Sequence, residues 1–142
     1  RADADRAAGE EVTDAALANK LVLAPLQEWT RTISIRDERP NEVIKDDRIP
    51  LLLRELNYPT FITIDETGFW KKYLCDRHYA ILYFALNKDQ QSHIPKLLRR
   101  LLRLPEFKTK AARMGKVARI SMTSVKYYQL QDERLYLRHL ID

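Results

Sequence analysis

The chain lacks the features that mark membrane-spanning and disulfide-stabilised proteins. No apolar run approaches the roughly 18 residues that a membrane-spanning helix needs. The single cysteine, Cys75, cannot form an internal disulfide and has no companion at the spacing of a zinc site. No charged and then apolar leader follows Arg1, and the chain has neither an internal repeat nor a low-complexity tract. We therefore expect a soluble, cytoplasmic protein.

The 142 residues are enough for one ordinary core, and the charge is divided unevenly along them. Residues 1–70 hold nine Lys and Arg against fourteen Asp and Glu, a net charge of −5, whereas residues 71–142 hold sixteen against six, a net charge of +10. A basic half favours polyanions through phosphate contacts and counterion release. The alternative is a solvated basic surface that only keeps the protein soluble.

Residues 1–40 have a different character from the rest of the chain. They begin with a polar, Ala-rich stretch that predicts a tail through Glu10. Thr13 is a fair N-cap for a short amphipathic helix. Apolar and polar residues then alternate over residues 28–36, which predicts an edge strand or an extended arm. We expect this tail, helix and arm to precede a domain formed by residues 41–142.

From Glu42 onward, strand-like and helix-like segments alternate, which is typical of βαβ units on a parallel sheet. The expected strands cover residues 42–45, 61–64, 79–86 and 117–122. One helix is expected to begin at Ile49, and a second helix contains Ile94. A short basic segment over residues 105–113 follows, with Gly115 as its C′ residue. Residues 124–130 and 134–140 predict either a hairpin or a strand followed by a helix. The predicted fold is a three-layer α/β sandwich with a mostly parallel, Rossmann-like sheet and an N-terminal helical extension.

Acidic residues recur where the expected strands end. Asp46 and Asp47 follow the first strand, Asp65 follows the second, and Asp89 follows the strand over residues 79–86. Because the carboxyl ends of parallel strands lie along one edge of a sheet, these acids can converge there. Clustered carboxylates repel one another, and a bound divalent cation is one reason for such an arrangement.

Each of these residues also has a purely structural interpretation. Asp47 and Asp89 stand where N-caps of the following helices are expected. Asp65 is a common residue type in turns. His78 precedes a strand and therefore lies at the end of the sheet opposite the acids, while His93 lies nearer to them, and both are expected to be structural.

The clearest helical pattern combines an apolar face with a basic one. Ile94, Leu97, Leu98, Leu101 and Leu102 share one face, and Lys96, Arg99, Arg100 and Arg103 lie on the other. These four cations could hold a nucleic-acid backbone, although they equally fit the solvent-facing side of an ordinary helix. Trp70 and Tyr73 have a spacing that is typical of packing rather than of a base-stacking platform.

Two stretches resemble the motifs of small PIN-like domains. The run Asp46-Asp47-Arg48-Ile49-Pro50, followed by leucines, is similar to the opening motif, in which a strand ends in two acids and a helix starts around a proline. Phe61-Ile62-Thr63-Ile64-Asp65 with Phe69 resembles the second signature, a strand that ends in Thr-x-Asp with an aromatic residue shortly after it. The resemblance covers residues 42–142.

PIN-like domains are typically metal-dependent ribonucleases, many of them toxins of bacterial toxin–antitoxin pairs, with acids at the carboxyl edge of a Rossmann-like sheet. By this resemblance Asp46 and Asp65 match the most characteristic acids, and Asp47 is a neighbour. The family usually has a further acid two positions after the second Asp, where this chain has Thr67. Asp89 is the best candidate to replace it.

The resemblance therefore implies an endoribonuclease that uses Mg²⁺ or Mn²⁺ to activate water, with Asp46, Asp65 and Asp89 as metal ligands and Asp47 as a fourth catalytic acid. It also implies an antitoxin protein or a second copy of the chain as partner. The alternative is a catalytically degenerate PIN-like binding module that acts through nucleic-acid or protein contacts. A receiver-like phosphoacceptor domain fits less well. Such a domain also starts with an acid pair after its first strand, but it needs its phosphoacceptor Asp on a later strand and a Lys after the last one. Here Asp65 comes on the very next strand, and no suitable Lys follows.

Overall fold

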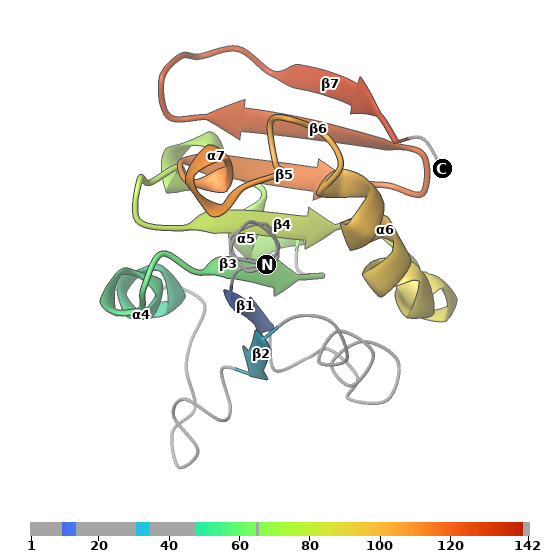
Figure 1. The fold of residues 1–142 in the computed structure, drawn as a ribbon, viewed down its shortest axis with the longest axis horizontal. Helices are drawn as coiled ribbons and strands as arrows, with labels where there is room; N and C mark the ends of the chain where they lie inside the picture. The colour runs from blue at the N-terminus through green and yellow to red at the C-terminus, as the bar shows by residue number, and fades with distance from the viewer. Residues whose placement is uncertain (1–9, 14–30, 35–47, 65, 141–142) are drawn as a thin grey trace.

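The computed structural model describes residues 10–13, 31–34, 48–64 and 66–140, which form a seven-stranded mixed sheet (Figure 1). The strands are β1 (Glu10–Thr13), β2 (Arg31–Ser34), β3 (Thr60–Thr63), β4 (Ala80–Phe84), β5 (Lys116–Ile120), β6 (Ser124–Gln129) and β7 (Tyr136–His139). Their order across the sheet is β2-β1-β3-β4-β5-β6-β7. The pairs from β2 to β5 are parallel, and those from β5 to β7 are antiparallel. The predicted α/β class is thus confirmed.

The helices connect the parallel strands and cover both faces of the sheet. They are α4 (Ile49–Glu55), α5 (Glu66–Phe69), α6 (Ile94–Leu101), α7 (Lys110–Arg113) and the 3₁₀ helices η3 (Lys72–Leu74) and η4 (Lys88–His93). Both α4 and α6 have a proline in the first turn, where the missing N–H would have no intrahelical acceptor. In the part of the chain that the structure describes, no helix has the length and apolar character that a membrane crossing requires.

The central strands are buried on both faces because successive side chains point to opposite sides of a sheet. Phe61 of β3, Ile81 of β4 and Val117 of β5 pack in one cluster with apolar residues of α4 and α5. The next residue in each strand, Ile62, Leu82 and Ala118, packs on the other face against α6. This two-sided burial explains why these strands appear in the sequence as continuous apolar runs rather than as alternating ones.

The N-terminal portion departs from the expectation at its first described strand. A tail was expected through Glu10 and a helix from Thr13, but residues 10–13 form β1, which pairs with β2 on one side and β3 on the other. Hydrogen bonds to two neighbouring strands outweigh the low strand preference of Glu10 and Glu11. The expected arm over residues 28–36 contains the edge strand β2, as predicted. The remainder of the expected helix and the expected strand over residues 42–45 lie outside the described residues.

The C-terminal segment is a hairpin, which settles the alternative between a hairpin and a strand followed by a helix. β6 and β7 pair in antiparallel register, with Tyr127 opposite Tyr136. Asp132 stabilises the connecting turn, because its carboxylate accepts hydrogen bonds from the backbone N–H of Arg134 at 3.0 Å and from the Tyr136 hydroxyl at 2.5 Å. The sheet therefore ends in an antiparallel extension beyond β5.

The basic segment over residues 105–113 forms a shorter helix than predicted. α7 begins only after Thr109, whose hydroxyl accepts a hydrogen bond from Ala112 N at 3.1 Å. Arg113 at its end is fully buried: its Nε donates to Thr60 Oγ1 at 3.1 Å, and a terminal nitrogen donates to the carbonyl of Phe107 at 2.9 Å. This arginine therefore serves the core rather than the basic surface.

Replacing Thr60 by Val should destabilise the protein by removing the hydrogen bond between Thr60 and Arg113. Valine keeps the shape of threonine but removes the oxygen that accepts from Arg113. We expect the free energy of unfolding in urea to fall by about 1–3 kcal/mol, because a buried donor loses its partner. The matched control is Thr60→Ser, which keeps the hydroxyl and should lose less. If both variants lost the same free energy of unfolding, the Thr60 hydroxyl would not be the stabilising partner of Arg113.

Gly115 occupies the expected C′ position, with a φ of 87° that side chains rarely adopt. A Cβ at this position would meet only the Leu130 Cβ, at an ordinary 3.5 Å, so the cost of a side chain comes from the backbone rather than from a clash. We expect stability to decrease in the order Gly, Asn, Ala and Val, with a loss of about 1–2 kcal/mol for Gly115→Ala. Chemical denaturation of the four proteins tests this order, and an Ala variant as stable as wild type would refute it.

Candidate functional site

The carboxyl edge of the parallel strands is the place where the sequence predicts a site. Thr63 of β3 lies opposite Tyr83 of β4, and Phe84 of β4 lies opposite Ile120 of β5. The three strands therefore end at nearly the same level. The segments that leave them contain Asp65, Asp89 and the serine-rich turn that starts at Ser121.

Of the four acids predicted for this edge, the structure describes only Asp89. Asp46, Asp47 and Asp65 lie outside the described residues. Asp89 belongs to η4, is exposed, and makes no hydrogen bond or ion pair with any described residue. Among the described residues, no group of three His, Cys, Asp or Glu side chains is placed to hold a metal ion.

The capping role considered for Asp89 belongs to other residues. The N-cap of η4 is Asn87, whose backbone N–H donates to Gln90 Oε1 at 2.9 Å, and the N-cap of α6 is His93. The prediction that Asp89 caps the helix containing Ile94 is therefore wrong, because the chain begins to coil one turn earlier. The N-cap position of α4 falls on Arg48, while Asp47 lies outside the described residues.

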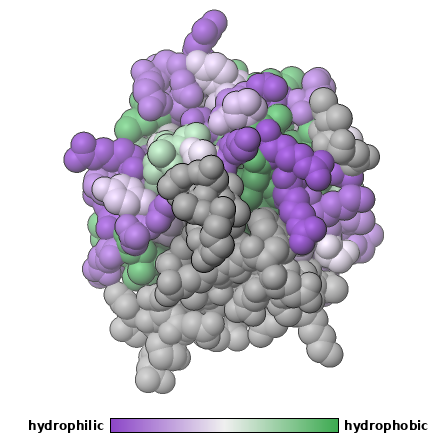
Figure 2. All heavy atoms as spheres, viewed as in Figure 1, coloured by the Kyte–Doolittle hydropathy of each residue, from purple (hydrophilic) through white to green (hydrophobic). Residues whose placement is uncertain are grey.

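The predicted basic stripe is confirmed on the outer face of α6 and in the turn that follows it. Ile94, Leu97, Leu98 and Leu101 are buried against the sheet. Lys96, Arg99 and Arg103 are exposed, whereas Arg100 is half-buried. Hydrophilic side chains dominate the right of Figure 2, where α6 lies in the matching view of Figure 1. Because α6 follows directly after η4, the first of these cations, Lys96, lies close to the carboxyl edge.

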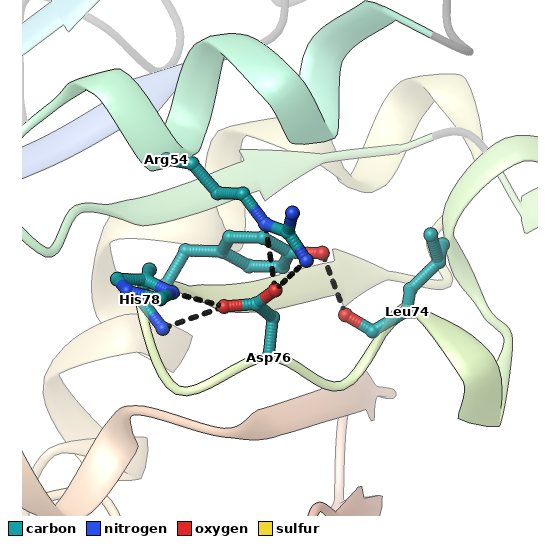
Figure 3. Close-up of polar contacts among 5 residues, drawn as sticks. Arg54, Leu74, Asp76 and His78 are labelled. Atoms are coloured by element: carbon teal, nitrogen blue, oxygen red, sulfur yellow. Dashed lines mark hydrogen bonds and ion pairs between the residues drawn. The ribbon is translucent and has the colours of Figure 1, made fainter.

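A different polar cluster, which the sequence did not reveal, lies at the amino edge of the sheet. Asp76 precedes β4 and is only 9% exposed. One of its carboxylate oxygens accepts from the Arg54 guanidinium, with Nε at 2.8 Å. The other accepts from the His78 backbone N–H at 2.8 Å and lies 2.8 Å from the His78 Nδ1. Figure 3 shows Asp76 between these two partners.

This cluster fixes the start of β4 and its connection to α4. Tyr79, adjacent to His78, donates its hydroxyl to the carbonyl of Leu74 at 2.7 Å, and burial raises the pKa of this tyrosine to about 12. The prediction that His78 lies at the end of β4 opposite Asp89 is confirmed. The only sequence signal for the cluster was an Asp two residues before a His at a strand start, because Arg54 is 22 residues away.

Next to this cluster, Tyr58 stacks on His78 with ring centroids 6.0 Å apart. Tyr58 has a φ of 50°, a strained value for a residue with a side chain. With Lys110, Ala111 and Met114 it lines a hollow of about 460 Å³. Cys75, close by in the chain, is half-buried, and burial raises the pKa of its thiol, which disfavours a reactive thiolate. Cys75 is therefore a poor nucleophile at this edge.

The comparisons with known proteins find no matching family model, no matching curated protein and no matching solved structure. The function must therefore be argued from the residues and their arrangement.

The Asp76 cluster predicts a specific dependence of stability on pH. Burial raises the pKa of this carboxyl, but hydrogen bonds from His78 and Arg54 outweigh burial and lower it below its ordinary value of 3.8. Its contribution to stability is therefore complete above that value and is lost as the pH falls through the lower pKa of the folded state. At neutral pH, Asp76→Asn should lower the free energy of unfolding by about 1–3 kcal/mol.

Urea denaturation between pH 7 and pH 3 tests this prediction, with Asp89→Asn as the control because Asp89 is exposed and has no described partner. The difference between wild type and Asp76→Asn should shrink toward pH 3. A difference that persists unchanged at pH 3, or an equal loss in the control, would show that the ionised Asp76 is not the stabilising group.

Proposed function

We propose that this protein is a metal-dependent endoribonuclease of the PIN-like type, with a three-layer α/β arrangement. The observation that carries the proposal is the parallel, in-register pairing of β3 with β4. This pairing makes the chain leave both strands at the same edge, and Asp65 is two residues beyond Thr63 in the sequence. Asp89 follows β4 on the same edge, so two acids from neighbouring strands can meet there.

Asp46, Asp65 and Asp89 would hold the metal ion, with Asp47 beside them. Their donors are all carboxylate oxygens, which suit Mg²⁺ or Mn²⁺, and Asp89 is exposed and without a described partner that would compete for it. When bound, such an ion lowers the pKa of a coordinated water and polarises a phosphate. The cations of α6 bind the RNA backbone and orient the scissile phosphodiester toward these acids.

The resemblance to PIN-like domains supports a toxin–antitoxin context, with an antitoxin protein as the inhibitory partner and a cytoplasmic location. It also supports a homodimer as the assembly. A second candidate function is a non-catalytic PIN-like module that binds nucleic acid or protein. One observation favours it: Thr67 stands where the family usually has a further acid.

Cleavage of an unstructured RNA in the presence of Mn²⁺ tests the catalytic proposal. We expect Asp46→Asn and Asp65→Asn to lower the rate by at least about 100-fold, because each removes a charged ligand. Glu133→Gln is the control, since its side chain is 90% exposed in the turn after β6. Wild-type protein that leaves RNA intact, or acid variants as active as the control, would exclude the nuclease.

Metal titration separates the two candidates without relying on activity. A competent site binds Mn²⁺ in the folded state only, so the melting temperature should rise with the Mn²⁺ concentration and follow mass action. Asp65→Asn should abolish this rise, while Glu133→Gln should keep it. A wild-type melting temperature that does not respond to Mn²⁺ would favour the non-catalytic module.

A further inference from the structure

Among the described residues, the antiparallel extension of the sheet is less covered on the face opposite α6, which we call the open face. Val125 and Tyr127 of β6 are buried on the α6 side. Their neighbour Lys126 points to the other side and is exposed, and so is Leu137, its partner on β7, at 52%. The buried cluster formed with α4 and α5 reaches as far as Val117 of β5, and beyond it Trp70 packs on this face against Tyr128, which leaves Lys126 and Leu137 exposed.

Two cations lie side by side on this open face. Arg119 of β5 is directly opposite Lys126 of β6 in the antiparallel register. Like charges at directly opposed positions destabilise a sheet. Within the part of the chain that the structure describes, neither side chain forms an ion pair or a hydrogen bond. Glu133, in the turn after β6, pairs with Lys72 at 3.9 Å instead. The repulsion between Arg119 and Lys126 therefore destabilises the sheet, and no contact with a described residue offsets it.

Aromatic rings flank these cations. Tyr128 lies two residues beyond Lys126 and therefore on the same face, and its ring centroid is 5.0 Å from that of Trp70. Tyr73, three residues after Trp70, is 76% exposed, and the Lys71 ammonium lies 5.9 Å from its ring centroid. Trp70 and Tyr128 are half-buried and Tyr73 is exposed, and cations beside such rings suit a ligand that presents both phosphates and unstacked bases.

We propose that this face, formed by Arg119, Lys126, Tyr128 and Leu137 with Trp70 packed against it and Tyr73 of the following η3, binds single-stranded nucleic acid. Phosphates neutralise the opposed cations, and the rings stack on bases. The inference goes beyond the proposed function, because binding here requires neither the acids of the carboxyl edge nor cleavage. It also differs from the α6 stripe, which lies on the other side of the sheet.

Binding is tested with fluorescein-labelled oligo-U and oligo-dT by fluorescence anisotropy, using the full chain carrying Asp65→Asn in EDTA so that cleavage plays no part. In this background, Lys126→Glu should weaken oligonucleotide binding about fivefold or more and lower the slope of log affinity against log salt by about 0.7. Lys108→Glu, an exposed cation on the loop between α6 and α7, is the matched control for net charge.

The same substitution should raise the melting temperature by about 1–3 °C, because it replaces two opposed cations by an ion pair with Arg119. Weaker binding by a more stable protein rules out unfolding as the cause. The proposal is overturned if Lys126→Glu and Lys108→Glu weaken binding equally, since the effect would then be one of net charge alone.

Stacking is tested with Tyr73→Ala, which should weaken binding about fivefold or more, whereas Tyr58→Ala, an exposed aromatic at the amino edge, should not. Equal binding to oligo-U and oligo-dT indicates recognition without the 2′-hydroxyl, and tighter binding to oligo-U indicates that RNA is the ligand.

Two further results would overturn the proposal. One is binding of polyglutamate that is as tight as binding of the oligonucleotides and depends on Lys126 to the same extent. The other is a wild-type dimer in sedimentation that Leu137→Lys dissociates, because this face would then bind a second copy of the chain.

Discussion

Burial of β3, β4 and β5 on both faces is the constraint on which the rest of the structure depends. Phe61 and Ile62 are adjacent in β3 and both are fully buried, on opposite sides of the sheet, and the same holds for Ile81 and Leu82 in β4. A shift of one residue would exchange the sets of side chains that face α4 and α6. The register is therefore fixed, and with it the level at which each strand ends.

The fixed register gives the two edges of the sheet different characters. At the amino edge, Asp76 and Arg113 are buried, and their hydrogen bonds tie α4, α7 and the strand starts together. At the carboxyl edge, Asp89 is exposed and has no described partner, and the cations of α6 stand nearby. Polar groups that are fully satisfied stabilise a fold, whereas accessible charges are available to a ligand. For this reason we place the proposed catalytic site at the carboxyl edge.

Much of the central fold could be predicted from local patterns. The leucine spacing predicted α4 and α6, the apolar runs predicted β3 and β4, and Gly115 was correctly assigned as a C′ residue. The strand β1 was missed because it has only one apolar residue, Val12, and its pairing with two neighbours is not visible in the local sequence. The partners of Arg113 and Asp76 were missed because Thr60 and Arg54 are 53 and 22 residues away in the sequence. Among the predicted acids, the exposure of Asp89 is described, and the grouping of the others remains a prediction.

The most direct measurement is anomalous X-ray diffraction from crystals grown with Mn²⁺. Convergence of the acids at the carboxyl edge predicts an anomalous peak about 2–2.3 Å from carboxylate oxygens of both Asp46 and Asp65, with Asp89 in the same coordination sphere or one water away. If the carboxylates of Asp46 and Asp65 are too far apart to share one ion, the proposed catalytic site does not exist, and a peak elsewhere on the surface would not rescue it.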